Sequence, residues 1–496
     1  MTRKLVVVGA GPVGCLAAIA LAKMGWSVEI YEARPDMRLP SSREAAQQRS
    51  INLAISSRGI AAMQAIDPAA ASRFLDSVIP MRGRLIHDSN GNLDSQLYDR
   101  DGQSINSIDR ALLNQGLLNE VLSVDSIRVL FRHKIVSINF DGRMIRVFDV
   151  GKGEELEKSF DLCIGADGSY SVVRRQLMRV VRMDFQQVYI PHEYIELKIP
   201  AGTDNRNDPV FLLDPNHLHI WPRHSFMLIA LPNKDKSFTC TLFAPTTEFE
   251  KLSHDDQILA WFKKHFSDAF EFIGTEGLLN SFHQNPRSPL VSIKAKPYHY
   301  KDRAIILGDA AHSMVPFYGQ GLNCGLEDVR VLTALLHEEG VHPTAGQDPD
   351  DFDLRLARAL SRYSESRHED LIAINDLAMD NYVEMRHSVT TPAHKLRRMV
   401  DNLLFSLTCR TPVTLASLGA FAAGVTFAPG IPRGWLPLYT MVTFRPDISY
   451  STAKRKAAKQ DRVISNVGIA GSVVLGIASV GMASMALFHR TRTYYS

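Results

Sequence analysis

Residues 4–32 read KLVVVGAGPVGCLAAIALAKMGWSVEIYE, and this stretch carries the clearest indication of the fold class. An apolar strand-like run, a glycine-rich turn, an apolar helical stretch and a second short strand follow one another without a break. This order predicts a βαβ unit. A chain that begins in this way is expected to build an α/β fold around a doubly wound, Rossmann-like sheet.

The turn inside this unit contains GxGxxG, formed by Gly9, Gly11 and Gly14. Gly9 is expected to make the tight turn, Gly11 to let a pyrophosphate approach the backbone, and Gly14 to let the helix pack against the strand. Glu32, at the end of the second strand, is placed to bind a ribose hydroxyl. The motif predicts a bound dinucleotide but does not distinguish FAD from NAD.

Two later stretches favour FAD. DLCIGADGSYSVVR (161–174) places Asp167 and Gly168 after an apolar strand, and RAIILGDAAHSMVPFYGQGLNCGLEDV (303–329) places Asp309 after another. Together with the first turn, these motifs resemble those of the flavoprotein aromatic hydroxylases. The resemblance implies that Asp309 contacts the FAD ribitol chain and that the later turn meets the flavin ring at a helix N-terminus, whose partial positive charge stabilises reduced flavin.

Further stretches narrow the resemblance to the kynurenine 3-monooxygenase family. They include SINLAISSRG (50–59), IPMRGRLIH (79–87), QQVYIPHEYIEL (186–197), NYVEMR (381–386) and PLYTMVTF (437–444). The resemblance implies an FAD-dependent monooxygenase that converts L-kynurenine into 3-hydroxy-L-kynurenine with NADPH and O2. NADPH rests on the resemblance alone, since no sequence feature indicates a site for its 2′-phosphate and NADH stays open.

The same resemblance implies the site residues. A substrate clamp falls on Arg84, Tyr98, Asn381 and Tyr439, and its chemistry is suitable because the carboxylate of an amino acid needs a guanidinium and polar donors. No residue is assigned as a catalytic acid or base, no metal is expected, and His312 is interpreted as structural. The residues implied for the cofactor are Gly9, Gly11, Val13, Gly14, Tyr31, Glu32, Ala33, Arg34, Ala54, Arg110, Ile135, Asp309, Leu322 and Asn323.

Changes of pattern along the chain predict its organisation. Alternating β-like stretches such as YIELKI, FMLIALP and FTCTLF predict a mostly antiparallel substrate-side sheet, and helical periodicities dominate from Gly319 to residue 404. The expected parts are an FAD-binding part with substrate-contacting segments (1–185), the β-sheet substrate domain (186–290), an FAD-binding return with helices (291–404), a membrane-proximal region (405–462) and a transmembrane helix (463–488).

The last of these parts is a charge-free stretch, 463–488. As a helix it spans roughly 39 Å, against a hydrocarbon core of about 30 Å. More basic residues precede it than follow it, which predicts a catalytic domain in the cytosol, and the resemblance implies the mitochondrial outer membrane. The alternative is an amphipathic or core-packed helix. The small-residue-rich stretch 411–432 is a second candidate for a buried or membrane-grazing helix.

Composition excludes several classes of protein. The formal net charge is +3 with both signs interspersed, so no basic face for nucleic acid is indicated. The five cysteines show no metal-ligand or disulfide spacing and are expected to be reduced. Two other functions remain open: a flavin hydroxylase of another aromatic, such as a salicylate-like phenol, and a membrane-anchored, redox-responsive flavoprotein that acts as a binding module.

Overall fold

The computed structural model describes residues 2–39, 52–99, 101–344, 352–386, 391–408 and 432–466. Its first sheet has the order β20-β21-β12-β1-β2-β8. The central strands pair in parallel, and only β20 at the edge is antiparallel, which confirms the α/β prediction. The strands are β1 (Lys4–Val8), β2 (Ser27–Glu32), β8 (Ile127–Phe131), β12 (Leu162–Gly165), β20 (His299–Tyr300) and β21 (Ala304–Ile306).

Helices cover this sheet because its central strands are apolar on both faces. The first helix, α1 (Pro12–Lys23), buries eight residues and packs against α5 (Arg110–Leu122) and α12 (Gly321–Glu338). The remaining helices of this part are α3 (Ser57–Ile66), α4 (Pro68–Leu75), α6 (Val172–Leu177), α11 (Asp309–His312) and the short η1 (Pro316–Tyr318).

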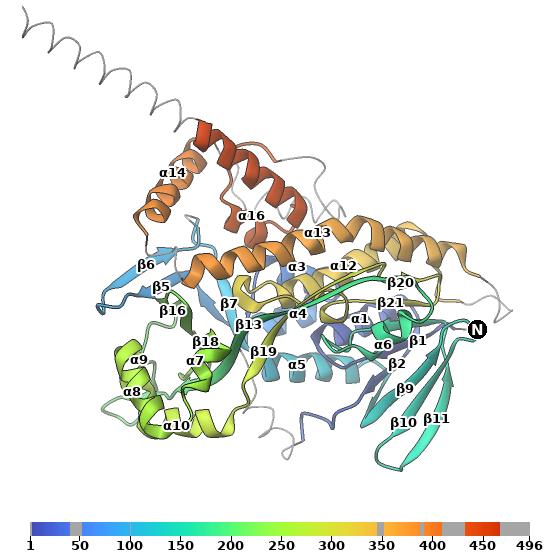
Figure 1. Ribbon diagram of the computed structural model, residues 1–496. Coiled ribbons are helices and arrows are strands. Elements are labelled where there is room, and N and C mark those ends of the chain that lie inside the picture. The colour runs from blue at the N-terminus through green and yellow to red at the C-terminus, as the bar shows by residue number, and fades with distance from the viewer. Residues whose placement is uncertain are drawn as a thin grey trace, which may run out of the picture.

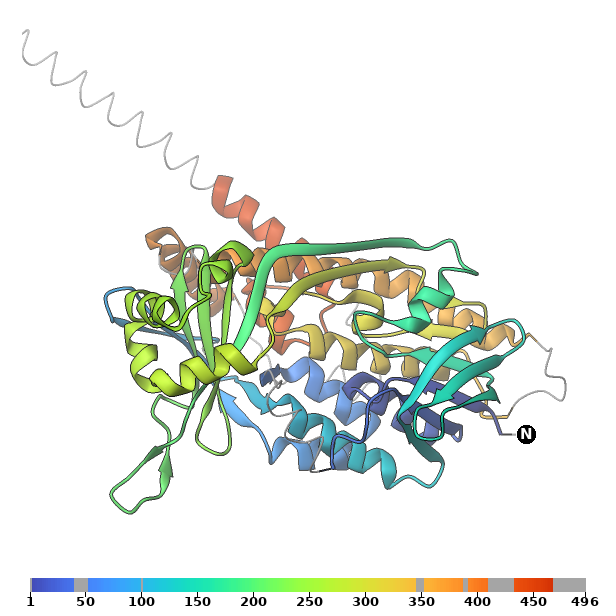
Figure 2. The same ribbon diagram turned by 60° about the horizontal axis from the view of Figure 1, so that its bottom comes forward.

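A second sheet of seven strands has the order β19-β13-β18-β17-β16-β5-β6. All neighbours pair antiparallel except β16 and β5, so the predicted, mostly antiparallel sheet is present. β13 and β19 run side by side from one part of the molecule to the other (Figure 2). The strands are β5 (Gly83–His87), β6 (Leu93–Leu97), β13 (Asp184–Ile199), β16 (His217–Arg223), β17 (Phe226–Pro232), β18 (Phe238–Pro245) and β19 (Ser288–Lys296).

Four short helices pack on one face of the second sheet and enclose a separate aromatic-rich core, which includes Trp221, Phe238 and Phe262. They are α7 (Thr246–Glu250), α8 (Asp255–His265), α9 (Ser267–Ile273) and α10 (Thr275–Gln284). The remaining strands form three small sheets: β3 (Asn52–Ile55), β7 (Ile105–Asp109) and β4 (Ile79–Met81); β9 (His133–Asn139), β10 (Met144–Asp149) and β11 (Glu154–Ser159); β14 (Gly202–Thr203) and β15 (Pro209–Val210).

The C-terminal part is helical. The long α13 (Leu354–Arg386) runs along the molecule and contacts both α12 and the second sheet (Figure 1). It is followed by α14 (Pro392–Thr408), α16 (Leu438–Phe444) and a helix over 450–466. In the described residues no helix is long and apolar enough to cross a membrane. The predicted span 463–488 lies outside them from residue 467 on, and so does 411–432 apart from its last residue.

Candidate functional site

The three glycines of the first turn have the geometry that their predicted roles require. Gly9 has a φ of +100°, and a Cβ there would lie 2.5 Å from the carbonyl oxygen of Ala166. A Cβ on Gly14 would lie 2.0 Å from the Gly9 carbonyl oxygen. A Cβ on Gly11, in contrast, would meet no atom within 4 Å. The backbone at Gly11 is therefore open to a ligand, while Gly9 and Gly14 are required by close packing.

Glu32 ends β2 directly beside this turn. Its carboxylate accepts hydrogen bonds from the backbone N–H groups of Ala10 (2.9 Å) and Arg34 (3.0 Å) and pairs with the Arg34 guanidinium (2.9 Å). Burial raises the pKa of Glu32, but Arg34 and these N–H groups outweigh that effect and lower it. Glu32 is thus a buried anion, which can accept from a ribose hydroxyl.

Tyr31 and Ala33 flank Glu32 in different ways. The Tyr31 hydroxyl donates to Glu29 (2.6 Å), and its backbone carbonyl accepts from Gly9 (2.9 Å). Tyr31 therefore supports the turn rather than presenting its buried ring to a ligand. Ala33 and Arg34 are exposed, and the Arg34 carbonyl accepts from Arg132 (3.1 Å), which brings the start of β9 and its Ile135 to this edge.

The two later motifs arrive at the same edge of the sheet. Asp167 accepts hydrogen bonds from Ser171, the N-cap residue of α6 (2.5 Å), and from the Val172 N–H at the start of that helix (2.6 Å). Arg174 then donates to the carbonyls of Ser169 and Ala310, each at 2.7 Å, and so joins the Asp167 loop to α11. Asp309, the first residue of α11, is exposed. Of the two aspartates, Asp309 is the one whose carboxylate is exposed to a ligand, at the first residue of α11.

The N-terminus of α12 is the third element of the candidate cofactor site, after the first glycine turn and the two later motifs. Its N-cap residue, Gln320, forms no side-chain cap, so the first N–H groups of the helix, including that of Leu322, are available to a ligand. Asn323 is fully buried: its amide donates to the carbonyls of Ala54 (2.9 Å) and Gly319 (2.7 Å) and accepts from Ser56 (2.8 Å). The Asn323 side chain therefore holds the loop of Ala54 against α12.

Two predicted cofactor residues, Val13 and Arg110, lie at the edge of the candidate cofactor site. Val13 packs beneath it, and a Cβ at Gly308 or Gly325 would lie 3.1 or 2.7 Å from a Val13 methyl group. Arg110 is exposed at the start of α5, where Asp109 accepts from the Leu112 N–H (2.9 Å) as the helix cap. The open backbone at Gly11, the exposed Asp309 and the uncapped α12 fit FAD, with its pyrophosphate, ribitol and flavin ring along this edge.

The predicted substrate residues meet in an aromatic cluster. The ring of Tyr439 in α16 stacks on Tyr98 (centroids 4.9 Å apart) and on Tyr318 of η1 (5.8 Å). The guanidinium carbon of Arg84 in β5 lies 5.4 Å from the Tyr439 ring centroid. We call Arg84, Tyr98, Tyr318 and Tyr439 the aromatic clamp. Burial is the largest factor in raising the pKa of all three tyrosines, that of Tyr439 to about 12, so their hydroxyls stay neutral.

Arg84 is the only charged member of the clamp, and its side chain is 14% exposed. Its Nη1 lies 3.6 Å from Oε1 of Glu384 in α13, and it forms no hydrogen bond within the described part of the chain. Burial, the largest single effect, lowers the pKa of Arg84, but Glu384 and the three neighbouring tyrosines together outweigh it and raise the pKa, so the guanidinium stays charged. A buried cation with an unsatisfied donor is suited to an anionic ligand group.

Asn381 reaches this cluster indirectly. Its amide donates to the Phe317 carbonyl (2.7 Å), immediately before Tyr318, and Glu384 follows one turn later on the same helix. All four predicted clamp residues therefore lie in one region. Sequence reasoning missed Tyr318 and Glu384, although both lie within motifs quoted above, and Arg398 of α14, which donates to the Leu97 carbonyl beside Tyr98. No local pattern indicates Arg398.

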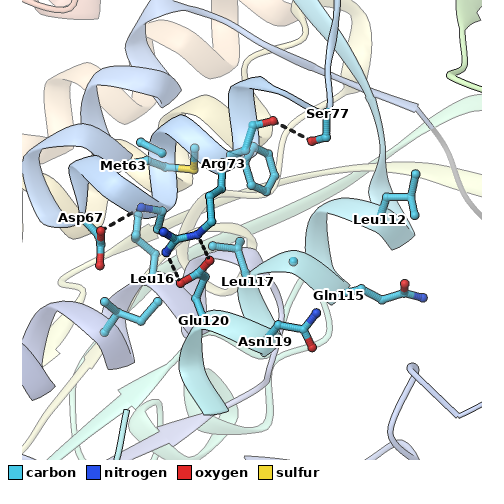
Figure 3. A pocket seen from close by; sticks show the side chains of 15 residues that line it. Leu16, Met63, Asp67, Arg73, Ser77, Leu112, Gln115, Leu117, Asn119 and Glu120 are labelled. Carbon is cyan, nitrogen blue, oxygen red and sulfur yellow. Dashed lines mark hydrogen bonds and ion pairs between the residues drawn. The ribbon is translucent and has the colours of Figure 1, made fainter. Parts of the chain in front are cut away.

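Two other features of the described residues do not belong to this site. A cavity of about 320 Å³ lies behind α1, between α4 and α5, with the Arg73–Glu120 ion pair (2.6 Å) at its edge (Figure 3). The ligand atoms of His312, Cys324 and Asp328 lie within 4.8 Å of one another. Asp328 and Cys324 both contact the Arg367 guanidinium, whose charge opposes a cation there. His312 is buried and paired with Asp328, which fits the structural role predicted for it.

Comparison with known proteins agrees with this geometry. The FAD binding domain family model matches residues 2–340, so the chain belongs to the FAD-binding monooxygenase class that its fold and turn define. Among solved structures, 2-methyl-3-hydroxypyridine-5-carboxylic acid oxygenase (18% identical, TM-score 0.59, 79% of this chain and 95% of that one) and PqsL from Pseudomonas aeruginosa (18%, 0.59, 78% and 97%) share the fold.

Curated relatives with higher sequence identity narrow the assignment to one family within this class. Kynurenine 3-monooxygenase from Cryptococcus neoformans var. neoformans serotype D is 46% identical over 505 residues, covering 98% of this chain and 97% of that protein. The Saccharomyces cerevisiae protein of the same name is 41% identical over 489 residues, with 97% of each chain covered. The chain belongs to the kynurenine 3-monooxygenase family.

Proposed function

We propose that the protein hydroxylates L-kynurenine to 3-hydroxy-L-kynurenine with FAD, NADPH and O2. The observation that carries the proposal is Arg84, a buried cation among tyrosine rings with an unsatisfied donor. An aromatic α-amino acid fits this site because its carboxylate can pair with the guanidinium and its ring can pack against the tyrosine rings. A phenol without a carboxylate leaves Arg84 unsatisfied, whereas a salicylate-like phenol also supplies a carboxylate, so the assay below has to separate the latter from kynurenine.

The chain's own contribution to the reaction is placement and the exclusion of water. Reduced by NADPH, bound FAD supplies the activated oxygen. Arg84 and the hydroxyls of the clamp hold the amino-acid end of the substrate, and the rings of Tyr98, Tyr318 and Tyr439 exclude water around it. The aniline nitrogen of kynurenine already activates the ring carbon beside it, so we assign no catalytic acid or base.

The test of this function is a single assay on the purified, FAD-loaded protein. NADPH oxidation is followed with and without L-kynurenine, and products are identified by mass spectrometry. We expect a substrate-stimulated rate and one new product, 16 mass units heavier than kynurenine. Stimulation by a salicylate-like phenol alone supports another hydroxylase, and FAD binding without stimulation by any aromatic supports the binding-module alternative. Replacement of NADPH by NADH tests the reductant.

We further propose that the protein is anchored in the mitochondrial outer membrane by residues 463–488, with the catalytic part in the cytosol. A surface of the described residues supports the membrane contact. Leu396, Met399, Leu403 and Leu407 of α14 are 59–69% exposed and recur at helical spacing along one stripe. Arg397 of α14 pairs with Asp461 (2.7 Å), which places this stripe beside the helix that leads into the anchor (Figure 1). Such a stripe is suited to the lipid interface.

A further inference from the structure

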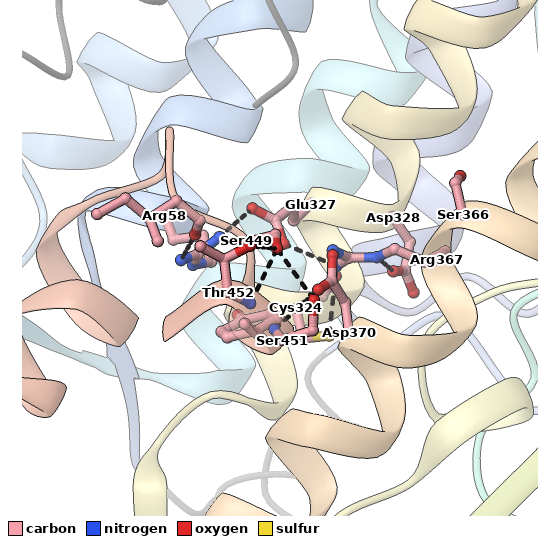
Figure 4. A network of polar contacts seen from close by, with 12 residues as sticks. Arg58, Cys324, Glu327, Asp328, Ser366, Arg367, Asp370, Ser449, Ser451 and Thr452 are labelled. Atoms are coloured by element: carbon pink, nitrogen blue, oxygen red, sulfur yellow. Dashed lines mark hydrogen bonds and ion pairs between the residues drawn. The ribbon is translucent and has the colours of Figure 1, made fainter. Parts of the chain in front are cut away.

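Arg58, on α3, is fully buried and makes an unusual set of contacts (Figure 4). Its guanidinium donates to four backbone carbonyls of the C-terminal segment: Met441 (3.4 Å), Val442 (3.1 Å), Arg445 (3.1 Å) and Ile448 (2.7 Å). A fifth bond, to Glu327 of α12, is 2.6 Å long. One side chain thus connects three segments that are far apart in sequence.

The four carbonyls belong to the end of α16 and the turn that follows it. The last carbonyls of a helix have no partners within the helix, and α16 has no basic residue in its last turn to satisfy them. Arg58 supplies this cap from α3. Because α16 has only seven residues, its own hydrogen bonds cannot hold it in place. The helix is therefore held by the packing of its buried residues and by the contacts of its C-terminal carbonyls with Arg58.

Arg58 is also connected, through Glu327, to the elements that line the candidate cofactor site. Glu327 lies on α12, one turn beyond Asn323, and α3 itself follows the Ala54 loop that Asn323 holds. Tyr450 adds a second link, since its hydroxyl donates to Gln320 at the N-cap of α12 (3.1 Å). Its ring also lies 4.1 Å from the Arg58 guanidinium.

We propose that Arg58 is a positioning residue for the substrate site, which sets Tyr439 at a constant distance from the flavin-binding end of α12 by capping α16. The inference rests on the proposed function, because it takes the aromatic clamp as the kynurenine site. Arg58 touches neither substrate nor cofactor in this scheme. Its role is to couple the ring that binds the substrate to the helix that binds the flavin.

A conservative variant can test this role because the surrounding charges remain compensated. Glu327 also pairs with Arg367 (2.7 Å) and Arg330 (3.1 Å), so it keeps two cations when Arg58 is changed. Arg58→Lys retains a positive charge beside Glu327, but an ammonium cannot reproduce five bonds spread over two helices. Arg367→Lys is the matched control, since Arg367 is equally buried and its ion pairs are with α12 and α13.

The experiment compares the full-length, FAD-loaded wild type with both variants. We expect Arg58→Lys to retain FAD, to raise the Kd for L-kynurenine about tenfold, or about 1.4 kcal/mol, and to lower the fraction of NADPH oxidation that yields hydroxylated product. Hydrogen exchange should accelerate at the amides of 438–448. Arg367→Lys should lower stability without this selective change in Kd or exchange. In a Tyr439→Ala background the effect of Arg58→Lys on Kd should shrink, because both changes act through the same helix.

Several results overturn the inference. One is an Arg58→Lys protein with an unchanged Kd for L-kynurenine and unchanged hydrogen exchange at 438–448. Another is a loss of FAD from Arg58→Lys that accounts for its weaker substrate binding. A third is an Arg367→Lys protein whose Kd and hydrogen exchange change as much as those of Arg58→Lys. A wild type that does not bind L-kynurenine refutes the proposed function instead, and the exchange measurement still tests the cap. If Arg58→Lys fails to fold, Tyr450→Phe removes only the hydroxyl that donates to Gln320 and should raise the Kd about threefold, or about 0.6 kcal/mol.

Discussion

Arg84→Ala is the most direct test of the aromatic clamp. The guanidinium is largely buried and 3.6 Å from its nearest carboxylate, Glu384, so the protein does not already satisfy it fully. One charge-assisted hydrogen bond contributes about 1.5–3 kcal/mol, and truncating a buried, paired charge costs about 2–5 kcal/mol. With some compensation from water that enters the space, we expect the free energy of kynurenine binding to weaken by about 2–4 kcal/mol, a 30- to 900-fold increase in Kd.

The assay is titration of the flavin absorbance with L-kynurenine, together with the rate of kynurenine-stimulated NADPH oxidation. FAD content should be unchanged in Arg84→Ala, because Arg84 lies on β5 and not among the turns that fit the cofactor. Arg84→Lys should recover little binding, since an ammonium lacks the fork that matches a carboxylate. Arg82→Ala is the control, because Arg82 is exposed two residues earlier in the same segment and should have no effect.

A normal Kd and normal 3-hydroxykynurenine output in Arg84→Ala would show that Arg84 does not bind the substrate carboxylate. A parallel loss of FAD would also count against it, because the change would then act through the fold. An equal effect of Arg82→Ala would point to general surface charge rather than to a buried contact.

The other predictions concern the cofactor, the pH dependence and the membrane. Gly11→Leu should yield a folded, colourless protein, since the side chain fills the open approach at the turn; absorbance at 450 nm measures this, and a yellow variant contradicts the assignment. Burial is the main factor that raises the pKa of Glu196 to about 7, so ionisation of this carboxyl destabilises the folded protein increasingly as the pH rises from about 4.5 to 7. Glu196→Gln should therefore raise the free energy of unfolding by up to about 2 kcal/mol at pH 8 and leave it unchanged at pH 4. Equal shifts of the melting temperature at both pH values would contradict this. Deletion of 463–496 should release the protein from carbonate-washed membranes with its flavin retained. If it still sediments, Leu403→Glu in the deleted chain distinguishes attachment through the α14 stripe from attachment through 411–432.

The cofactor half of the site was predictable because its determinants are local. The conformation of Gly9 and the close approach at Gly14 are properties of a strand–turn–helix unit, and a periodic apolar pattern marks the unit itself. Even here residue type did not reveal how each side chain is used. The amide of Asn323, a predicted cofactor residue, donates to the carbonyls of Ala54 and Gly319, because a buried amide must be satisfied by whatever backbone the fold brings to it.

The α/β class, the dinucleotide turn and the residue types of a clamp could be predicted from the sequence, because strand and helix periods and glycine geometry act over a few residues. The grouping of Tyr318 and Glu384 with Arg84, and the cap that Arg58 provides for a helix more than 380 residues further along the chain, become visible in the folded molecule alone. These contacts depend on the parallel pairing of β5 with β16 and on the packing of α13 and α16 against α12 and α3. Buried charges and unpaired carbonyls select their partners by proximity in the folded core, and no short-range pattern records that proximity.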